Sequence, residues 1–127
     1  MTARRGTNRQ LIVMAIMVAL ISLSVPIFRR SIIRDKETVL KNNLHSLRTV
    51  IHEYTNDKRK APRSLQDLIS DAYLRQIPVD PMTRSADSWK IIMEDATNTM
   101  NQAEPGIVDV RSGSNKNSLE GTPYSDW

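Results

Sequence analysis

Residues 11–28 read LIVMAIMVALISLSVPIF, a run of eighteen residues without a charged side chain. A helix rises about 1.5 Å per residue, so the run spans roughly 27 Å, close to the thickness of a bilayer core. Basic residues flank the run on both sides: Arg4, Arg5 and Arg9 precede it, and Arg29, Arg30 and Arg34 follow it. We therefore expect the protein to be anchored in a membrane at its N-terminus, or processed there. The rest of the chain would then work outside the cytoplasm or on its inner face.

Three interpretations of the apolar run remain open. A cleaved signal peptide needs a shorter apolar run and a small-x-small exit, and the stretch VPIFRR at residues 25–30 is a poor cleavage site. The run fits equally a signal anchor that stays in the membrane. It also fits a helix that serves first in the membrane and later packs against copies of itself. The flanking arginines are nearly balanced, so the positive-inside rule indicates orientation only weakly, and the short N-terminal side is placed in the cytoplasm by default.

The composition limits the class of protein. The chain has 127 residues, and the roughly 95 that follow the apolar run suffice for one small domain. The formal net charge is +4, but the charges nearly balance from Asp35 onward. No basic stripe with interleaved aromatic residues occurs, so we expect no nucleic-acid partner. The absence of cysteine excludes disulfides and thiol chemistry and is compatible with any compartment.

The helix is predicted to continue beyond the apolar run. Apolar residues recur at helical spacing over the next segment: Leu40, Leu44, Leu47, Ile51 and Tyr54. Residues between them, such as Lys41 and Arg48, suit a solvated face. Pro26 is the only helix breaker between residues 11 and 57, and we expect a kink or loosened hydrogen bonds there. We predict one helix from about residue 8 to about residue 57, whose stripe packs on a domain core or, alternatively, in a coiled coil.

A second helix and a rigid loop are predicted next. A polar loop at residues 56–63 leads to a helix opened by Ser64 and reaching Leu74, and Asp67 three residues after Ser64 resembles a capping box. The prolines of the stretch IPVDPMT at residues 77–83 favour an extended loop. Asp80, between those prolines, is expected to hydrogen-bond local backbone.

Two strands and a polar tail complete the chain. Strands are predicted at residues 89–93 and 107–111, the second with Val108 and Val110 on one face, and a loop is predicted at residues 95–106. The tail, residues 112–127, is rich in Ser, Asn and Gly and is expected to bury little. Its aromatic residues Tyr124 and Trp127 are expected to fold back on the sheet or on the long helix.

This organisation resembles the type IV pilins and pseudopilins: a basic leader, an apolar helix with a proline, an amphipathic continuation and a small α+β head. Within that superfamily the head is similar to the major pseudopilin of type II secretion. The likeness rests on YTNDK at 54–58, APRSLQDL at 61–68, YL at 73–74, IPVDP at 77–81, the strand around Trp89, and IVDVRSGS at 107–114. It spans roughly residues 11–127. It implies a pilin-like α+β fold in which a long N-terminal helix packs on a small antiparallel sheet.

The resemblance also implies processing at the N-terminus. In that family a leader that ends in glycine is removed by a prepilin peptidase, and the new N-terminus, an aromatic residue, is methylated. Gly6 is the only glycine near the start, and Thr7 follows it. The implied cleavage lies between Gly6 and Thr7, with N-methylation of Thr7, although no aromatic residue stands there.

A glutamate at the fifth position of the mature chain is a further family feature, and this chain lacks it. Cleavage after Gly6 places Leu11 at that position, and alignment on Met14 and Pro26 places Arg9 there. The first acidic residue is Asp35. The leader is therefore degenerate, and the carboxylate that would pair with a neighbour's N-terminal amine is missing.

The resemblance implies a structural subunit of a type II secretion pseudopilus, or of a related type IV pilus-like filament, that helps to move folded proteins across the outer membrane. Residues 1–10 would be a cytoplasmic segment, residues 11–28 would cross the bacterial inner membrane once, and residues 29–127 would form a periplasmic head. The buried filament core would include Leu11, Ile12, Met14, Ile16, Leu20 and Pro26. Implied partners are copies of the chain, the inner-membrane secretion platform and minor pseudopilins. The alternative is a non-polymerising, membrane-anchored accessory or capping protein, which the missing glutamate favours.

A calcium site in the C-terminal loop is also implied by the resemblance. Calcium takes six to eight oxygen ligands from carboxylates, amides, hydroxyls and backbone carbonyls. The main candidates are Asp109, Ser112 and Asp126, and further oxygen donors are available on Ser114, Asn117, Glu120 and Ser125. A solvated polar tail capped by Trp127 is the alternative.

No motif for catalysis is present. His45 and His52 lie seven residues apart on one helix face and are interpreted as surface residues, because a metal site needs a third ligand. Glu94 and Asp95 are adjacent at a strand end, and no nucleophile accompanies them. The sequence has no phosphate loop, serine triad or zinc motif, so we predict that the protein is not an enzyme.

Overall fold

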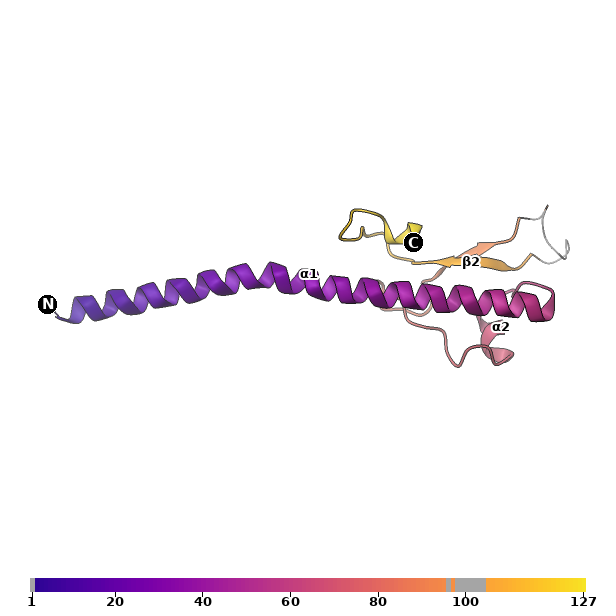
Figure 1. Cartoon of the computed structure of the whole chain (residues 1–127), viewed down its shortest axis with the longest axis horizontal. Coiled ribbons are helices and arrows are strands. Elements are labelled where there is room, and N and C mark those ends of the chain that lie inside the picture. Colours follow the sequence, from indigo (N-terminus) through magenta and orange to yellow (C-terminus); the bar gives the residue numbers. More distant parts are fainter. Residues whose placement is uncertain (1, 96, 98–104) are drawn as a thin grey trace. The chain divides into compact units, whose positions relative to one another are not determined.

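The structure is a computed structural model that describes residues 2–95, 97 and 105–127, with side chains described from Gly6 onward. Its elements, in chain order, are α1 (Thr2–Lys58), α2 (Leu65–Ser70), β1 (Lys90–Met93), β2 (Ile107–Arg111) and the 3-10 helix η1 (Tyr124–Asp126) (Figure 1). The chain divides into two compact units, Met1–Arg34 and Asp35–Trp127, and α1 contributes to both. Residues 96 and 98–104 of the predicted loop, and Met1 of the predicted leader, lie outside the described residues.

The first unit consists of the N-terminal part of α1. The helix begins at Thr2 rather than near residue 8, and it continues through Pro26. The earlier start is possible because no proline precedes the apolar run, and Gly6, the least favourable helix former there, weakens a helix by only about 1 kcal/mol. The hydroxyls of Ser22 and Ser24 donate to carbonyl oxygens of the preceding turn at 2.8 and 2.9 Å, so these polar groups are satisfied within the helix.

The apolar stripe in the second half of α1 forms the core of the second unit. All five residues of the stripe are buried: Leu40, Leu44, Leu47, Ile51 and Tyr54. They pack against buried side chains of α2, β2, η1 and the residue before β1, namely Leu68, Ile107, Val110, Tyr124 and Trp89. Figure 1 shows β2 on one side of this part of α1 and α2 on the other. The predicted α+β fold, a long N-terminal helix packed on a small antiparallel sheet, is confirmed, and this layout agrees with a pilin-like fold.

The predicted start of the second helix is confirmed, but its predicted cap is wrong. Ser64 precedes α2 in an extended conformation, and its side chain makes no cap hydrogen bond. The Asp67 carboxylate instead accepts a hydrogen bond from the backbone N–H of Arg63 at 3.0 Å. The Asp67 carboxylate therefore accepts from a backbone N–H that precedes the helix. The other half of a capping box, a hydrogen bond to the serine side chain, is not formed.

The end of α2 is a tight left-handed turn. Ala72 has a φ of +63°, a conformation that glycine adopts most readily. The backbone N–H of Ala72 donates to the carbonyl of Ile69 at 3.1 Å, and that of Tyr73 donates to the carbonyl of Leu68 at 2.8 Å. This pair of bonds is the Schellman motif, which ends the helix at Ser70, before the predicted end at Leu74.

The sheet has two antiparallel strands with a bulge. The register near the bulge pairs Ile92 with Asp109 and Met93 with Ile107. Val108 is therefore the extra residue on β2, and the side-chain alternation shifts at this point. As a result Ile107 and Val110 are both buried while Val108 is 50% exposed. The expectation that Val108 and Val110 share one face is wrong in terms of burial, because the bulge interrupts the period of two.

The last sixteen residues, 112–127, are called the C-terminal segment below. This segment buries more than its polar composition predicts, because Ser112, Ser114 and Ser118 are buried as well as Tyr124. Tyr124 belongs to the core, and the ring of Trp127 meets it edge to face at 5.2 Å between centroids. The prediction that the two aromatic residues fold back is confirmed.

Candidate functional site

The first feature that bears on function is an apolar surface on the N-terminal part of α1. The predicted filament-core residues lie there with large exposed fractions: Leu11 63%, Ile12 59%, Met14 66%, Ile16 54% and Leu20 60%. Pro26 is exposed as well. By length and composition this helix could cross a membrane, and no part of its most apolar window is buried within the chain. An apolar surface of this extent needs lipid or protein to cover it.

The predicted processing residues lie in the same helix. Gly6 and Thr7 are helical and exposed, and a side chain added at Gly6 would meet no neighbouring atom. Asp35, the first acidic residue of the chain, lies in the second unit. No carboxylate is therefore available in the first unit for a neighbour's N-terminal amine.

The second feature is the attachment of the C-terminal segment to α1. Glu37 on α1 is only 9% exposed, and its Oε1 accepts two hydrogen bonds from the C-terminal segment. The donors are the backbone N–H of Leu119 and the hydroxyl of Tyr124, both at 2.8 Å. Burial, together with the hydrogen bond to the Glu37 carboxylate, raises the pKa of Tyr124 to about 12. This tyrosine therefore holds its proton, and with it the bond to Glu37, far into the alkaline range.

Asp80 attaches the same segment to the proline-rich loop. Its side chain is fully buried, and Oδ1 accepts a hydrogen bond from the backbone N–H of Met82 at 2.8 Å. This bond confirms the predicted contact with local backbone. The other oxygen accepts from the Ser112 hydroxyl at 2.6 Å and from the Gly113 N–H at 3.2 Å. Asp80 thus joins two segments far apart in the sequence, which the local prediction did not include.

Arg48 joins α1 to β2 and to the end of the C-terminal segment. Its Nε donates to Asp109 Oδ1 at 2.7 Å, and its Nη2 donates to the carbonyl oxygen of Val110 at 3.0 Å. The same Nη2 also donates to the main-chain oxygen of Trp127 at 2.6 Å. The Arg48 side chain is 39% exposed, so it lies on the solvated face of the helix, as the sequence predicts. It differs from an ordinary surface residue because it binds three specific oxygen atoms.

The three main residues of the implied calcium site lie in different environments. Asp109 is paired with Arg48, and Arg111 Nε lies 4.0 Å from its second oxygen. The Ser112 hydroxyl is buried on Asp80, and Asp126 is exposed in η1. Within the part of the chain that the structure describes, no three His, Cys, Asp or Glu side chains are grouped as a metal site requires. The donor set as placed fits calcium poorly, and calcium binding stays a prediction.

The remaining sequence candidates lie apart from these contacts or at their edge. His45 and His52 are both exposed, as expected of surface residues. Glu94 Oε2 lies 3.4 Å from the backbone nitrogen of Gly106, which donates to it next to the bulge, and Asp95 is exposed. Of these side chains, His45 lines a pocket together with Arg48.

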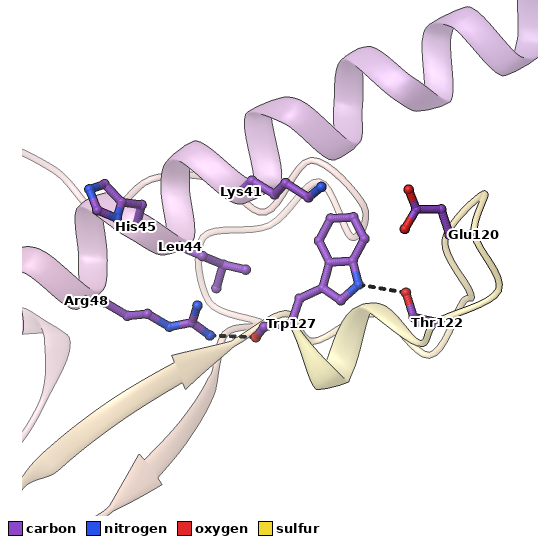
Figure 2. Close-up of a pocket in the computed structure, with 7 residues that line it drawn as sticks. All are labelled: Lys41, Leu44, His45, Arg48, Glu120, Thr122 and Trp127. Carbon is purple, nitrogen blue, oxygen red and sulfur yellow. Dashed lines mark hydrogen bonds between the residues drawn. The ribbon is translucent and has the colours of Figure 1, made fainter.

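A pocket of about 360 Å³ lies between α1 and the C-terminal segment. Its lining residues are Lys41, Leu44, His45, Arg48, Glu120, Thr122 and Trp127. Figure 2 shows Lys41, Leu44 and Arg48 extending from α1 toward Trp127, with Thr122 and Glu120 on the opposite segment. The ammonium of Lys41 lies 4.8 Å from the centre of the indole, and the indole N–H donates to the Thr122 hydroxyl at 3.1 Å. Arg48 and Trp127, which both line this pocket, are joined by the hydrogen bond from Nη2 of Arg48 to the main-chain oxygen of Trp127.

Sequence reasoning missed Glu37 and the distant partners of Asp80 and Arg48. A single Glu on an amphipathic helix is usually solvated, and nothing in its neighbours marks Glu37 as buried. The one available signal was Asp80, because an acid between two prolines in an otherwise apolar loop is an unusual choice. Its distant partners could not be inferred, since they depend on how the C-terminal segment returns.

Comparison with protein-family models, with curated proteins and with solved structures found no match. Two features of the chain itself bear on its function: the apolar surface of residues 11–28 on α1, and the contacts that hold the C-terminal segment to the second unit.

Proposed function

We propose that the chain is a membrane-anchored structural subunit of a type II secretion pseudopilus, or of a related type IV pilus-like filament. Such a filament would help to move folded proteins across the outer membrane. The observation that carries this proposal is the contrast along α1. Residues 11–28 expose an apolar surface all round, whereas the apolar stripe of the second half is buried in the chain's own core. A surface of the first kind is stable only when lipid or other copies surround it.

The proposed location is the bacterial inner membrane, crossed once by residues 11–28. Residues 1–10 would lie in the cytoplasm and the head in the periplasm. The length of the apolar run and the internal hydrogen bonds of Ser22 and Ser24 support insertion, because a polar group in a bilayer core needs a partner within the protein.

The proposed partners are other copies of the chain. Copies would shield the apolar surface from water when the helix leaves the lipid, and Leu11, Ile12, Met14, Ile16, Leu20 and Pro26 would lie in the filament core. The inner-membrane secretion platform and minor pseudopilins are the further proposed partners. No catalytic role is proposed.

An accessory or capping protein that does not polymerise is the second candidate. It is favoured by one observation, the lack of any acidic residue before Asp35. Without such a carboxylate, a neighbour's N-terminal amine has no buried partner in the apolar part of the assembly. In this case the apolar run would serve only as a permanent anchor.

The first test is the intact mass of the full chain, expressed with and without a prepilin peptidase. A processed subunit would lose residues 1–6 and gain one methyl group on Thr7. An uncut chain that starts at Met1 would instead favour the permanent anchor.

Assembly is tested by cysteine crosslinking, because the chain has no cysteine of its own. Chains that carry two cysteines within residues 11–28, for example at Ile16 and Ile27, should give a ladder of disulfide-linked multimers if copies stack. The matched control carries its two cysteines at exposed head positions Asn115 and Arg75. A scan of such pairs along the run that never gives products beyond a dimer would count against the filament and leave the accessory protein.

A further inference from the structure

We propose that the guanidinium of Arg48 is the cation that closes the C-terminal segment onto the head, and that this closure needs no bound calcium. The inference concerns the second unit alone and does not rest on filament assembly. It departs from the calcium site that the family resemblance implies. The protein's own side chains and backbone already engage the oxygens of Asp109, Ser112 and Ser114, three of the residues on which such a site would draw.

Asp109 is the first of these oxygen donors. Its Oδ1 accepts from Arg48 Nε at 2.7 Å and from the backbone N–H of Val110 at 2.8 Å. Arg111 Nε lies 4.0 Å from Oδ2. A divalent cation on Oδ1 would have to displace the Arg48 guanidinium, and one on Oδ2 would lie beside the Arg111 guanidinium, where like charges repel.

The hydroxyls of the segment are engaged in the same way. The Ser112 hydroxyl donates to Asp80 and accepts from the Ser114 N–H at 3.2 Å. The Ser114 hydroxyl accepts from the Lys116 N–H at 3.2 Å. The Ser118 hydroxyl pairs with that of Thr122 at 2.8 Å. These hydrogen bonds fix the orientation of the three buried serine hydroxyls toward partners within the protein.

Five backbone carbonyls of the segment are also used. Those of residues 116, 118, 122, 123 and 124 each accept a backbone hydrogen bond from within the segment. The residues at 117 and 123 form an antiparallel bridge. The C-terminal segment thus folds on itself, and a binding loop of open carbonyls is absent from these positions.

Arg48 supplies what a metal ion would otherwise supply at this place, a positive charge shared by oxygens of two segments. It holds Asp109 and the Val110 carbonyl on β2 and the main-chain oxygen of Trp127 at the end of the segment. Glu37 fixes the middle of the segment through Leu119 and Tyr124. The fork of a guanidinium can bind several oxygens at once, which an ammonium cannot do in the same geometry.

The experiment is hydrogen–deuterium exchange on the full chain in detergent micelles, with either millimolar calcium or a calcium chelator. The wild-type chain is expected to exchange residues 112–127 equally slowly in both conditions. Arg48→Met should speed exchange in this segment about tenfold in both conditions, which corresponds to about 1.4 kcal/mol less free energy of opening. Arg48→Lys should give an intermediate rate, because it keeps the charge and loses the fork. Arg75→Met, at an exposed arginine outside this contact, is the matched control and should leave the exchange unchanged.

Terbium gives an independent readout, since it binds calcium sites and is excited through nearby Tyr or Trp rings such as Tyr124 and Trp127. The wild-type chain should show no terbium emission that calcium competes away. Two results would overturn the proposal. One is calcium-dependent protection of residues 112–127, or competed terbium emission, in the wild-type chain. The other is an exchange rate of residues 112–127 equal to that of the wild-type chain in both Arg48→Lys and Arg48→Met. If Arg48→Met does not fold, the exchange rate of Arg48→Lys alone decides.

Discussion

Replacement of Asp80 by asparagine keeps the size of this buried side chain and removes its charge. In the native head one carboxylate oxygen accepts from the Met82 N–H, and the other accepts from the Ser112 hydroxyl and the Gly113 N–H. An asparagine has only one acceptor oxygen, so its NH₂ group must face one set of these donors. The Ser112 hydroxyl can rotate to accept from it, but a backbone N–H cannot.

The expected loss follows from these contacts. Hydrogen bonds to a charged group contribute about 1.5 to 3 kcal/mol each, and a buried donor left without an acceptor adds its own cost. We expect Asp80→Asn to lower the free energy of unfolding of the head by about 3 kcal/mol. Ser112→Ala breaks one of the same bonds. The double variant should therefore lose less than the sum of the single variants, by about 1 to 2 kcal/mol.

The assay is urea unfolding of the full chain in detergent, followed by the fluorescence of its two tryptophans, Trp89 and Trp127. Trp89 is buried, and its indole N–H donates to the Pro78 carbonyl, in the loop that holds Asp80, at 2.8 Å. Asp87→Asn, at an exposed acid seven residues away, is the control and should change stability by no more than about 0.5 kcal/mol. Equal unfolding midpoints for Asp80→Asn and Asp87→Asn would refute the idea that this carboxylate holds the two segments together.

Three further predictions concern single sites. Because burial and Glu37 raise the pKa of Tyr124 to about 12, the folded state keeps this proton when the unfolded chain loses it near pH 10. The contribution of this proton to the free energy of unfolding is full below pH 10 and is lost between about pH 10 and 12, a change of about 2 to 3 kcal/mol. In a pH series of unfolding midpoints, Tyr124→Phe should not show this loss. Ala72→Gly should raise stability by about 0.5 to 1 kcal/mol in thermal unfolding, because glycine adopts the positive φ without strain, and a lower midpoint would contradict this explanation. Gly113→Ala should prevent native packing of the head, since the added Cβ would lie 1.9 Å from the Ser88 carbonyl oxygen, and native Trp89 fluorescence in this variant would show that the backbone can move apart.

Much of the fold could be predicted from the sequence because its signals are local. Two signals each depend on one element alone: the apolar run at residues 11–28 and the helical spacing of the apolar residues from Leu40 to Tyr54. The long helix, apart from its earlier start at Thr2, and its buried stripe were predicted correctly. The two strands were placed to within a residue by their β-branched and aromatic content. Errors occurred where neighbours in space decide the outcome. The bulge at Val108 depends on the register with β1, and the end of α2 depends on a left-handed residue that is not glycine.

For the candidate site, the sequence and the tertiary structure determined clearly different features. The sequence by itself determined that the chain carries an apolar run of eighteen residues, long enough as a helix to span a bilayer core. Only the tertiary structure decided which polar groups hold the head together. Glu37, Arg48 and Asp80 reach partners 32 to 87 residues away, and such pairs follow from how the C-terminal segment returns to α1. The physical reason is that a helix or strand period is fixed by bonds between near neighbours, whereas a buried charge is stable only after the whole core has brought its partners to it.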